Sequence, residues 1–165
     1  MMFLGYLLLM RCFMKIWVDA DACPGEIKEI IIKAAHKRCI ETIFVSNKII
    51  YLPESPYLSA VKVPAGADVA DNYIAERAED KDLVITQDIP LAAALIPKGS
   101  VVISVHGDLF TSSNIRERLS VRNFMSDLRD TGVQTNGPKP FSNKDKQKFA
   151  NTFDQQLFKL LKFQT

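Results

Sequence analysis

Two short apolar segments of this chain are each followed within a few residues by an acidic residue and then a proline. The first covers residues 15–24 (KIWVDADACP) and the second covers residues 82–90 (DLVITQDIP). Proline suits the first position of a helix because its missing N–H needs no partner there, so each segment predicts a strand followed by a helix. Open parallel sheets bind ligands beyond the carboxyl ends of their strands. The repeated pattern therefore predicts an α/β fold with Asp19 and Asp88 at one edge of the sheet.

A third acidic cluster lies between these segments, at the start of a predicted amphipathic helix. Asp68 and Asp71 are three residues apart, a spacing that places both on one helix face. One interpretation is that Asp68 caps the helix while Asp71 lies in the first turn, where the helix dipole favours negative charge. Turn and capping chemistry also accounts for Asp19 and Asp21 taken alone. Capping does not explain why acids recur at three helix starts, two of them directly after strands.

Carboxylates that converge on one crevice repel each other unless protons or a cation intervene. Oxygen ligands suit Mg²⁺ or Mn²⁺, and the sequence offers no competing ligand cluster, because His36 and His106 are isolated and no C-x-x-C spacing occurs. Bound Mg²⁺ commonly combines a few carboxylates with substrate phosphates, which predicts phosphate-ester chemistry. The predicted metal ligands are Asp19, Asp21, Asp68, Asp71 and Asp88.

Four ordered motifs resemble the YaiI/YqxD family of bacterial proteins. They are DADACP at 19–24, VPAGADVADNYI at 63–74, VITQDIPLA at 84–92 and NGPKPFS at 136–142. The resemblance covers residues 14–162 and implies a branch of the PIN-like nuclease superfamily, whose members use a Rossmann-like sheet and acids that bind Mg²⁺ or Mn²⁺ to cut RNA. By motif it implies catalytic roles for Asp19, Asp71 and Asp88. His106, before Gly107, stands where the family often has an arginine.

Alternating strand and helix patterns complete the predicted fold, a three-layer PIN-like α/β domain with a mostly parallel five-stranded sheet and C-terminal helices. Strands are expected at 15–19, 42–46, 61–63, 83–86 and 101–105, and the resemblance implies the order 3-2-1-4-5. Residues 15–165 are expected to form a single domain, as a chain of 165 residues suits one core.

The apolar residues 1–14 are expected to be an N-terminal extension. They are too short to span a bilayer, which takes about 20 apolar residues, and they lack the basic start and cleavage site of a signal peptide. A membrane-surface anchor is the alternative interpretation. Three cysteines without paired spacing, Cys12, Cys23 and Cys39, favour a reducing compartment and so a cytoplasmic protein without stable membrane association. Cys23, beside the acids, is a candidate nucleophile if its thiol pKa is lowered.

Basic residues gather after Asn114, where the pattern again predicts a helix. Asn114 and Glu117 are expected to cap it and Gly132 to end it. Its apolar side would contain Ile115, Leu119, Phe124, Met125 and Leu128. A solvated helix face is one interpretation of its arginines, and phosphate binding by their planar guanidinium groups is the other. The predicted substrate-binding residues are Arg116, Arg118, Arg122 and Lys139.

The sequence thus predicts a divalent-metal-dependent nuclease with RNA, more than DNA, as its partner. One alternative is a phosphatase that uses Asp19 as nucleophile and Asp21 as acid and base. The other is an RNA- or protein-binding module whose acids hold a structural ion. A net charge of +2 does not separate these classes. The geometry of the acids does, because oxygens of Asp19, Asp71 and Asp88 within reach of one ion would favour the nuclease.

Overall fold

A computed structural model describes residues 14–135 and 140–162. Within these residues the centre of the fold is a six-stranded sheet in the order β3-β2-β1-β4-β5-β6. Its strands are β1 (Ile16–Asp19), β2 (Thr42–Ser46), β3 (Leu58–Lys62), β4 (Leu83–Ile85), β5 (Val101–Ile103) and β6 (Leu109–Phe110). The first five are parallel to their neighbours, and β6 pairs antiparallel with β5. The predicted order of the five parallel strands is confirmed, and β6 extends the sheet.

The central strands are buried on both faces. All residues of β1, β2 and β4 are buried, whereas β3 at the edge is largely exposed. Continuous apolar runs are typical of parallel strands that helices cover on both sides. Because β3 lacks such a run, its start at Leu58 was missed by a prediction of residues 61–63.

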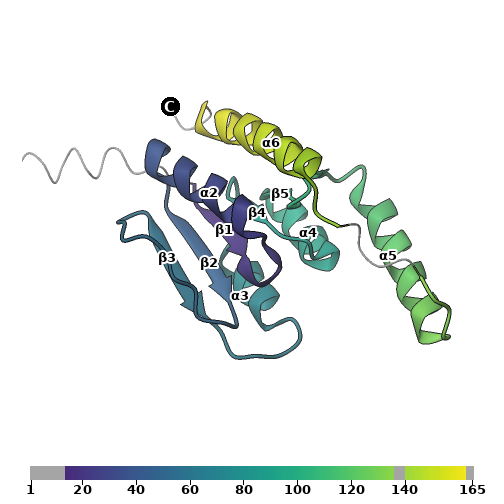
Figure 1. The fold of residues 1–165 in the computed structure, drawn as a ribbon. Helices are drawn as coiled ribbons and strands as arrows, with labels where there is room; N and C mark the ends of the chain where they lie inside the picture. The colour runs from purple at the N-terminus through teal and green to yellow at the C-terminus, as the bar shows by residue number, and fades with distance from the viewer. Residues whose placement is uncertain (1–13, 136–139, 163–165) are drawn as a thin grey trace, which may run out of the picture.

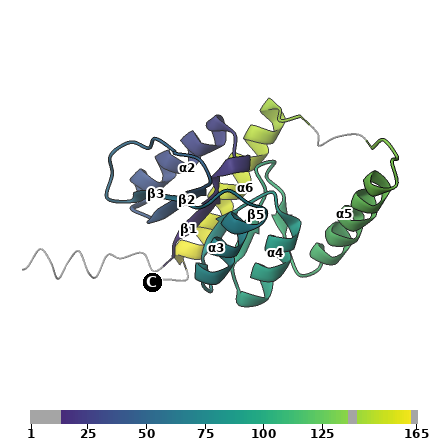
Figure 2. The same ribbon diagram turned by 90° about the horizontal axis from the view of Figure 1, so that it is seen from below.

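Helices cover both faces of this sheet, which gives a three-layer α/β fold (Figures 1 and 2). Helices α2 (Gly25–Arg38) and α6 (Asn143–Lys162) pack on one face, and α3 (Val69–Arg77) and α4 (Ile89–Leu95) pack on the other. The first core joins Val18 of β1 to Phe149 and Phe153 of α6, whose rings stack 5.3 Å apart. The second joins Trp17 of β1 to Ile74 of α3.

The backbone of α6 packs closely against Gly107, in the loop between β5 and β6. Gly107 has φ +85°, and a Cβ built there would lie 2.6 Å from backbone atoms of Lys148 and Phe149. The neighbouring His106 places Nδ1 3.2 Å from Oδ2 of Asp145 in the first turn of α6. That carboxylate also accepts a hydrogen bond from Ser142 N at 2.9 Å, a capping contact at the start of α6. His106 therefore fastens the C-terminal helix.

Helix α5 (Ile115–Asp130) departs from the prediction. It packs beside α4 and then extends away from the body of the domain (Figure 2). Ile115 is buried, but Val121, Phe124 and Met125 expose 52%, 62% and 39% of their surface. The prediction that the apolar side of this helix is buried is therefore wrong for Phe124 and Met125.

The predicted cap of α5 is also wrong. The Asn114 side chain makes no capping hydrogen bond, and its Oδ1 instead accepts one from Thr111 N at 2.8 Å. The predicted end of the helix is confirmed, because Gly132, with φ +83°, follows its C-cap Thr131. An αL glycine after a helix is a common stop signal.

Met14 is the first residue that the structure describes. It is buried and packs in the same core as residues of α2 and α6, although the prediction placed it in the N-terminal extension. The rest of the predicted extension, residues 1–13, lies outside the described residues, as does Lys139. Among the residues that the structure describes, no helix has the length and apolar character needed to cross a membrane.

Candidate metal centre

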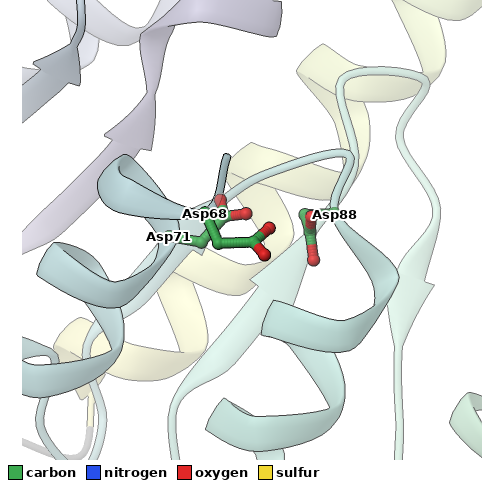
Figure 3. Close-up of side chains that lie close together, drawn as sticks. All are labelled: Asp68, Asp71 and Asp88. Atoms are coloured by element: carbon green, nitrogen blue, oxygen red, sulfur yellow. The ribbon is translucent and has the colours of Figure 1, made fainter. Parts of the chain in front are cut away.

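Three aspartates from two helix starts meet at the carboxyl edge of the sheet (Figure 3). Asp68 precedes α3, Asp71 lies in its first turn and Asp88 precedes α4, which follows β4. One carboxylate oxygen from each of the three lies within 4.8 Å of the others. Figure 3 shows Asp71 reaching from α3 toward Asp88. We call Asp68, Asp71 and Asp88 the acidic triad.

Capping accounts for only part of the acidic triad. Asp88 Oδ1 accepts a hydrogen bond from Leu91 N at 2.7 Å, so Asp88 caps α4. Asp68 occupies the cap position of α3, but its side chain makes no capping hydrogen bond, contrary to the capping interpretation. Its backbone is left-handed with φ +64°, a conformation that costs a non-glycine residue about 1 kcal/mol. Such backbone strain is concentrated at functional sites.

Crowding of negative charge perturbs Asp71. Burial, hydrogen bonding to Asp88 and the negative charges of Asp88, Asp19 and Asp68 together raise the pKa of Asp71 to about 7. At neutral pH and without a metal ion, Asp71 is therefore partly protonated. A divalent cation relieves the same repulsion, because it stabilises the ionised carboxylates.

Asp19 lies outside the acidic triad. It is buried at the end of β1, and Thr86 Oγ1 donates a hydrogen bond to its Oδ2 at 3.1 Å. Burial and the negative charges of Asp21 and Asp88 raise the pKa of Asp19, against the opposing effect of the Thr86 hydrogen bond. Asp19 nevertheless lines the same hollow of about 180 Å³ as Asp21, Asp68 and Asp71.

Asp21 is held by the neighbouring strand. It lies in a short 3-10 turn, η1 (Ala20–Ala22), after β1. One carboxylate oxygen accepts a hydrogen bond from Ser46 Oγ and the other accepts one from Asn47 N at 3.0 Å. Asp21 thus joins the ends of β1 and β2 and forms one wall of the hollow.

Thr86 is a site residue that the sequence analysis missed. Its hydroxyl donates to Asp19 and accepts a hydrogen bond from Asp88 N at 3.0 Å. It therefore links a β1 acid to the connection between β4 and α4. A threonine two residues before an aspartate is a signal for such a turn, because its hydroxyl reaches the backbone two residues on.

Asp82 shows what a structural aspartate looks like in this fold. It begins the second acidic segment but lies at the opposite end of β4. Its buried carboxylate accepts hydrogen bonds from Lys15 N, Trp17 Nε1 and Glu79 N at 2.9 to 3.0 Å. Three hydrogen-bond donors satisfy this acid.

Cys23 is not an activated nucleophile. The residue is buried against the core, and burial raises the pKa of its thiol to about 12. Helix α2 begins at Gly25, so Pro24 occupies its cap position and not the first helical position. The thiol behaves as a small apolar side chain.

The predicted basic residues divide into groups. Arg118 and Arg122 line a groove together with Arg129, while Arg116 is exposed and is not among the residues that line this groove. Arg118 Nη1 lies 3.6 Å from Asp108 Oδ2 and its guanidinium lies 5.5 Å from the centre of the Phe110 ring.

The chain is a three-layer Rossmann-like α/β protein with aspartates clustered beyond the carboxyl ends of its central strands. Residues 17–159 match a family model described as "Uncharacterized BCR, YaiI/YqxD family". The chain belongs to the YaiI/YqxD family, which confirms the resemblance of its four motifs.

Curated relatives support this membership over most of their length. A "UPF0178 protein" of Myxococcus xanthus is 53% identical over 149 residues, which cover 90% of this chain and 97% of the relative. One of Syntrophobacter fumaroxidans is 52% identical over 151 residues, 92% of this chain and 99% of the relative. One of Dechloromonas aromatica is 52% identical over 147 residues, 89% and 98% respectively. No solved structure matches the chain significantly.

Proposed function

We propose that this chain is a cytoplasmic, PIN-like, divalent-metal-dependent nuclease that hydrolyses phosphodiesters, in RNA more than in DNA. The observation that carries the proposal is the acidic triad, three carboxylates within 4.8 Å of one another at the carboxyl edge of a parallel sheet. Ligands of such sheets bind at this edge.

The donor set fits Mg²⁺ or Mn²⁺. Asp68, Asp71 and Asp88 would hold the ion with carboxylate oxygens, the ligands that hard divalent ions prefer. The raised pKa of Asp71 supports this fit, because burial and nearby carboxylates leave a surplus of negative charge. Such an ion, when bound, neutralises charge on a phosphodiester and makes water a better nucleophile.

The remaining residues of the hollow have supporting roles in this proposal. Asp19, oriented by the hydroxyl of Thr86, would accept a proton from the attacking water, and its raised pKa brings it closer to the range in which a general base works. Asp21 is tied to Ser46 and Asn47 and would shape the wall of the hollow.

The phosphatase alternative has less support. It needs Asp21 as a free acid that donates a proton to the leaving group. Both carboxylate oxygens of Asp21 instead accept hydrogen bonds, from Ser46 Oγ and Asn47 N. Both oxygens are therefore engaged by the end of β2, and neither is free to contact a leaving group.

A cleavage assay tests the proposal. The full chain is incubated with labelled single-stranded and structured RNAs, and with DNA, in Mn²⁺ or Mg²⁺. We expect cleavage by the wild type and a loss of at least about 100-fold in Asp71→Asn and Asp88→Asn, because transition-state charge stabilisation is typically that large. Asparagine at residue 88 can still accept the hydrogen bond from Leu91 N, so the α4 cap is retained.

Asp127→Asn provides the matched control, since Asp127 is an exposed acid on α5 outside the hollow. It should cut like the wild type. A protein that cuts neither RNA nor DNA with either ion would contradict the nuclease proposal. Tight RNA binding without cleavage would instead favour the binding-module alternative.

A further inference from the structure

A groove of about 590 Å³ lies between the start of α4 and helix α5. It includes Ile89, the residue directly after Asp88 of the acidic triad. Its lining residues on α5 include Glu117, Arg118, Val121, Arg122, Met125 and Arg129. Helix α5 extends away from the body of the domain (Figure 2), and its apolar residues Val121, Phe124 and Met125 are exposed.

The groove carries a surplus of positive charge. Three of its lining residues are arginines and one, Glu117, is an acid. Arg118 is partly neutralised by Asp108 at 3.6 Å. Arg122 and Arg129 have no ion-pair partner within the described part of the chain. Arg122 Nη1 donates a hydrogen bond to the neutral Asn123 Oδ1 at 3.4 Å, which leaves its charge uncompensated. Both guanidinium groups can therefore bind an anionic ligand, and the planar group suits phosphate.

Apolar side chains lie between these arginines. Val121 and Met125 are exposed, and with Ile89 they give the groove an apolar strip beside its positive charge. A nucleic-acid duplex presents phosphates and groove edges and keeps its base faces stacked inside. A single strand offers both phosphates and base faces, and sites for single strands combine basic grooves with aromatic side chains on which bases stack. In this groove the aliphatic side chains of Val121 and Met125 would take that place.

We propose that this groove binds a single-stranded polynucleotide. Its phosphates contact Arg122 and Arg129, its bases pack against Val121 and Met125, and the strand continues past Ile89 to the acidic triad. This inference rests on the proposed function, because it names the form of substrate that the same site receives. It also changes the set of predicted substrate-binding residues. Arg129 is added beside Arg122, and Arg116 is left out because it does not line the groove.

Binding is measured by fluorescence anisotropy with labelled 12-nucleotide RNA, DNA of the same sequence and the matching duplex, in EDTA. Chelation separates binding from cleavage. The full chain should bind both single strands more tightly than the duplex. The double variant R122E/R129E should weaken single-strand binding at least about 10-fold and reduce the slope of log affinity against log salt by about 1 to 2, as two lost phosphate contacts require.

The matched control is R116E/K33E, which makes the same change in net charge at two exposed residues that do not line the groove. It should retain binding within about threefold, since long-range charge effects are largely screened at 0.15 M salt. The variant V121S/M125S should lower the preference for single strand over duplex and leave the salt slope unchanged. All of these substituted residues are exposed, or half-exposed in the case of Met125, so the fold should tolerate them.

An equal loss of single-strand affinity in R122E/R129E and R116E/K33E would refute the proposal that this groove binds the strand. Duplex binding as tight as single-strand binding, or no binding to any of the three nucleic acids, would refute it as well. The two proposals fail separately. If the variants bind in EDTA as predicted but the wild type cleaves nothing in Mn²⁺, the groove proposal stands and the nuclease proposal is refuted. If R122E/R129E cleaves and binds like the wild type, the nuclease proposal stands and the groove proposal is refuted.

Discussion

Asp71→Asn should stabilise the metal-free protein, and it should do so more at pH 8 than at pH 5. Burial and the neighbouring carboxylates raise the pKa of Asp71 from 3.8 to about 7. Because the folded pKa lies above the unfolded value, the contribution of Asp71 to stability is present at low pH and is lost as the pH rises from about 4 through about 7. Asparagine cannot ionise, so the variant avoids this loss.

The size of the effect follows from the pKa shift. Between pH 5 and pH 7 the folded wild type holds a proton that the unfolded chain lacks, and for a fully buried carboxyl two pH units correspond to about 3 kcal/mol. Asp71 is only half-buried, so solvent screening reduces the expected difference to about 1 kcal/mol. The stabilisation by Asp71→Asn should therefore be about 1 kcal/mol larger at pH 8 than at pH 5.

Urea unfolding in EDTA measures this difference. Trp17 is the single tryptophan of the chain and is buried in the core, so its fluorescence reports global unfolding. Asp127→Asn serves as the control for removing one exposed negative charge and should show no such pH dependence. A gain in Asp71→Asn that is equal at the two pH values, or a loss at pH 8, would refute the reasoning about carboxylate crowding.

Other predictions follow from the same contacts. Saturating Mn²⁺, at about 100 times Kd, should stabilise the wild type by about 3 kcal/mol, measured as a rise in Tm, and a double variant with Asn at Asp71 and Asp88 should lose that rise; an undiminished rise would contradict the assigned ligands. Thr86→Val should cost about 1 to 3 kcal/mol in urea unfolding, because it leaves buried Asp19 without its hydroxyl donor, whereas Thr86→Ser should restore most of the stability. Gly107→Ala should destabilise by more than about 2 kcal/mol, since its Cβ meets the α6 backbone at 2.6 Å; a Tm equal to that of the wild type would show that α6 can shift.

The strands and the edge that carries the acids could be predicted because their causes are local, whereas the strand order was implied only by the family resemblance. Val18 and Ile85 belong to short apolar runs, which are typical of central parallel strands, and an acid follows each run. The geometry of the site depends on contacts and backbone conformations that no local pattern describes. Thr86 binds Asp19 across 67 residues of sequence, and Asp68 joins the triad through a left-handed backbone.

The error on α5 has a different physical cause. Helical spacing of apolar residues such as Phe124 predicts which face of a helix is apolar, but it does not say whether the rest of the chain supplies a surface to cover it. Here α4 contacts α5 and leaves Phe124 and Val121 exposed. The same limit applies to β6, whose two residues are too few for any periodicity.

Anomalous scattering from a crystal grown in Mn²⁺ tests the central claim most directly. We expect a manganese ion bound by carboxylate oxygens of Asp68, Asp71 and Asp88. The manganese–oxygen distances should be about 2.2 Å, as expected for an ion between Mg²⁺ and Ca²⁺ in size. The manganese peak should be absent from the Asp71→Asn variant under the same conditions. A wild-type crystal with no peak among these three residues at saturating Mn²⁺ would contradict the metal centre and the nuclease proposal that depends on it.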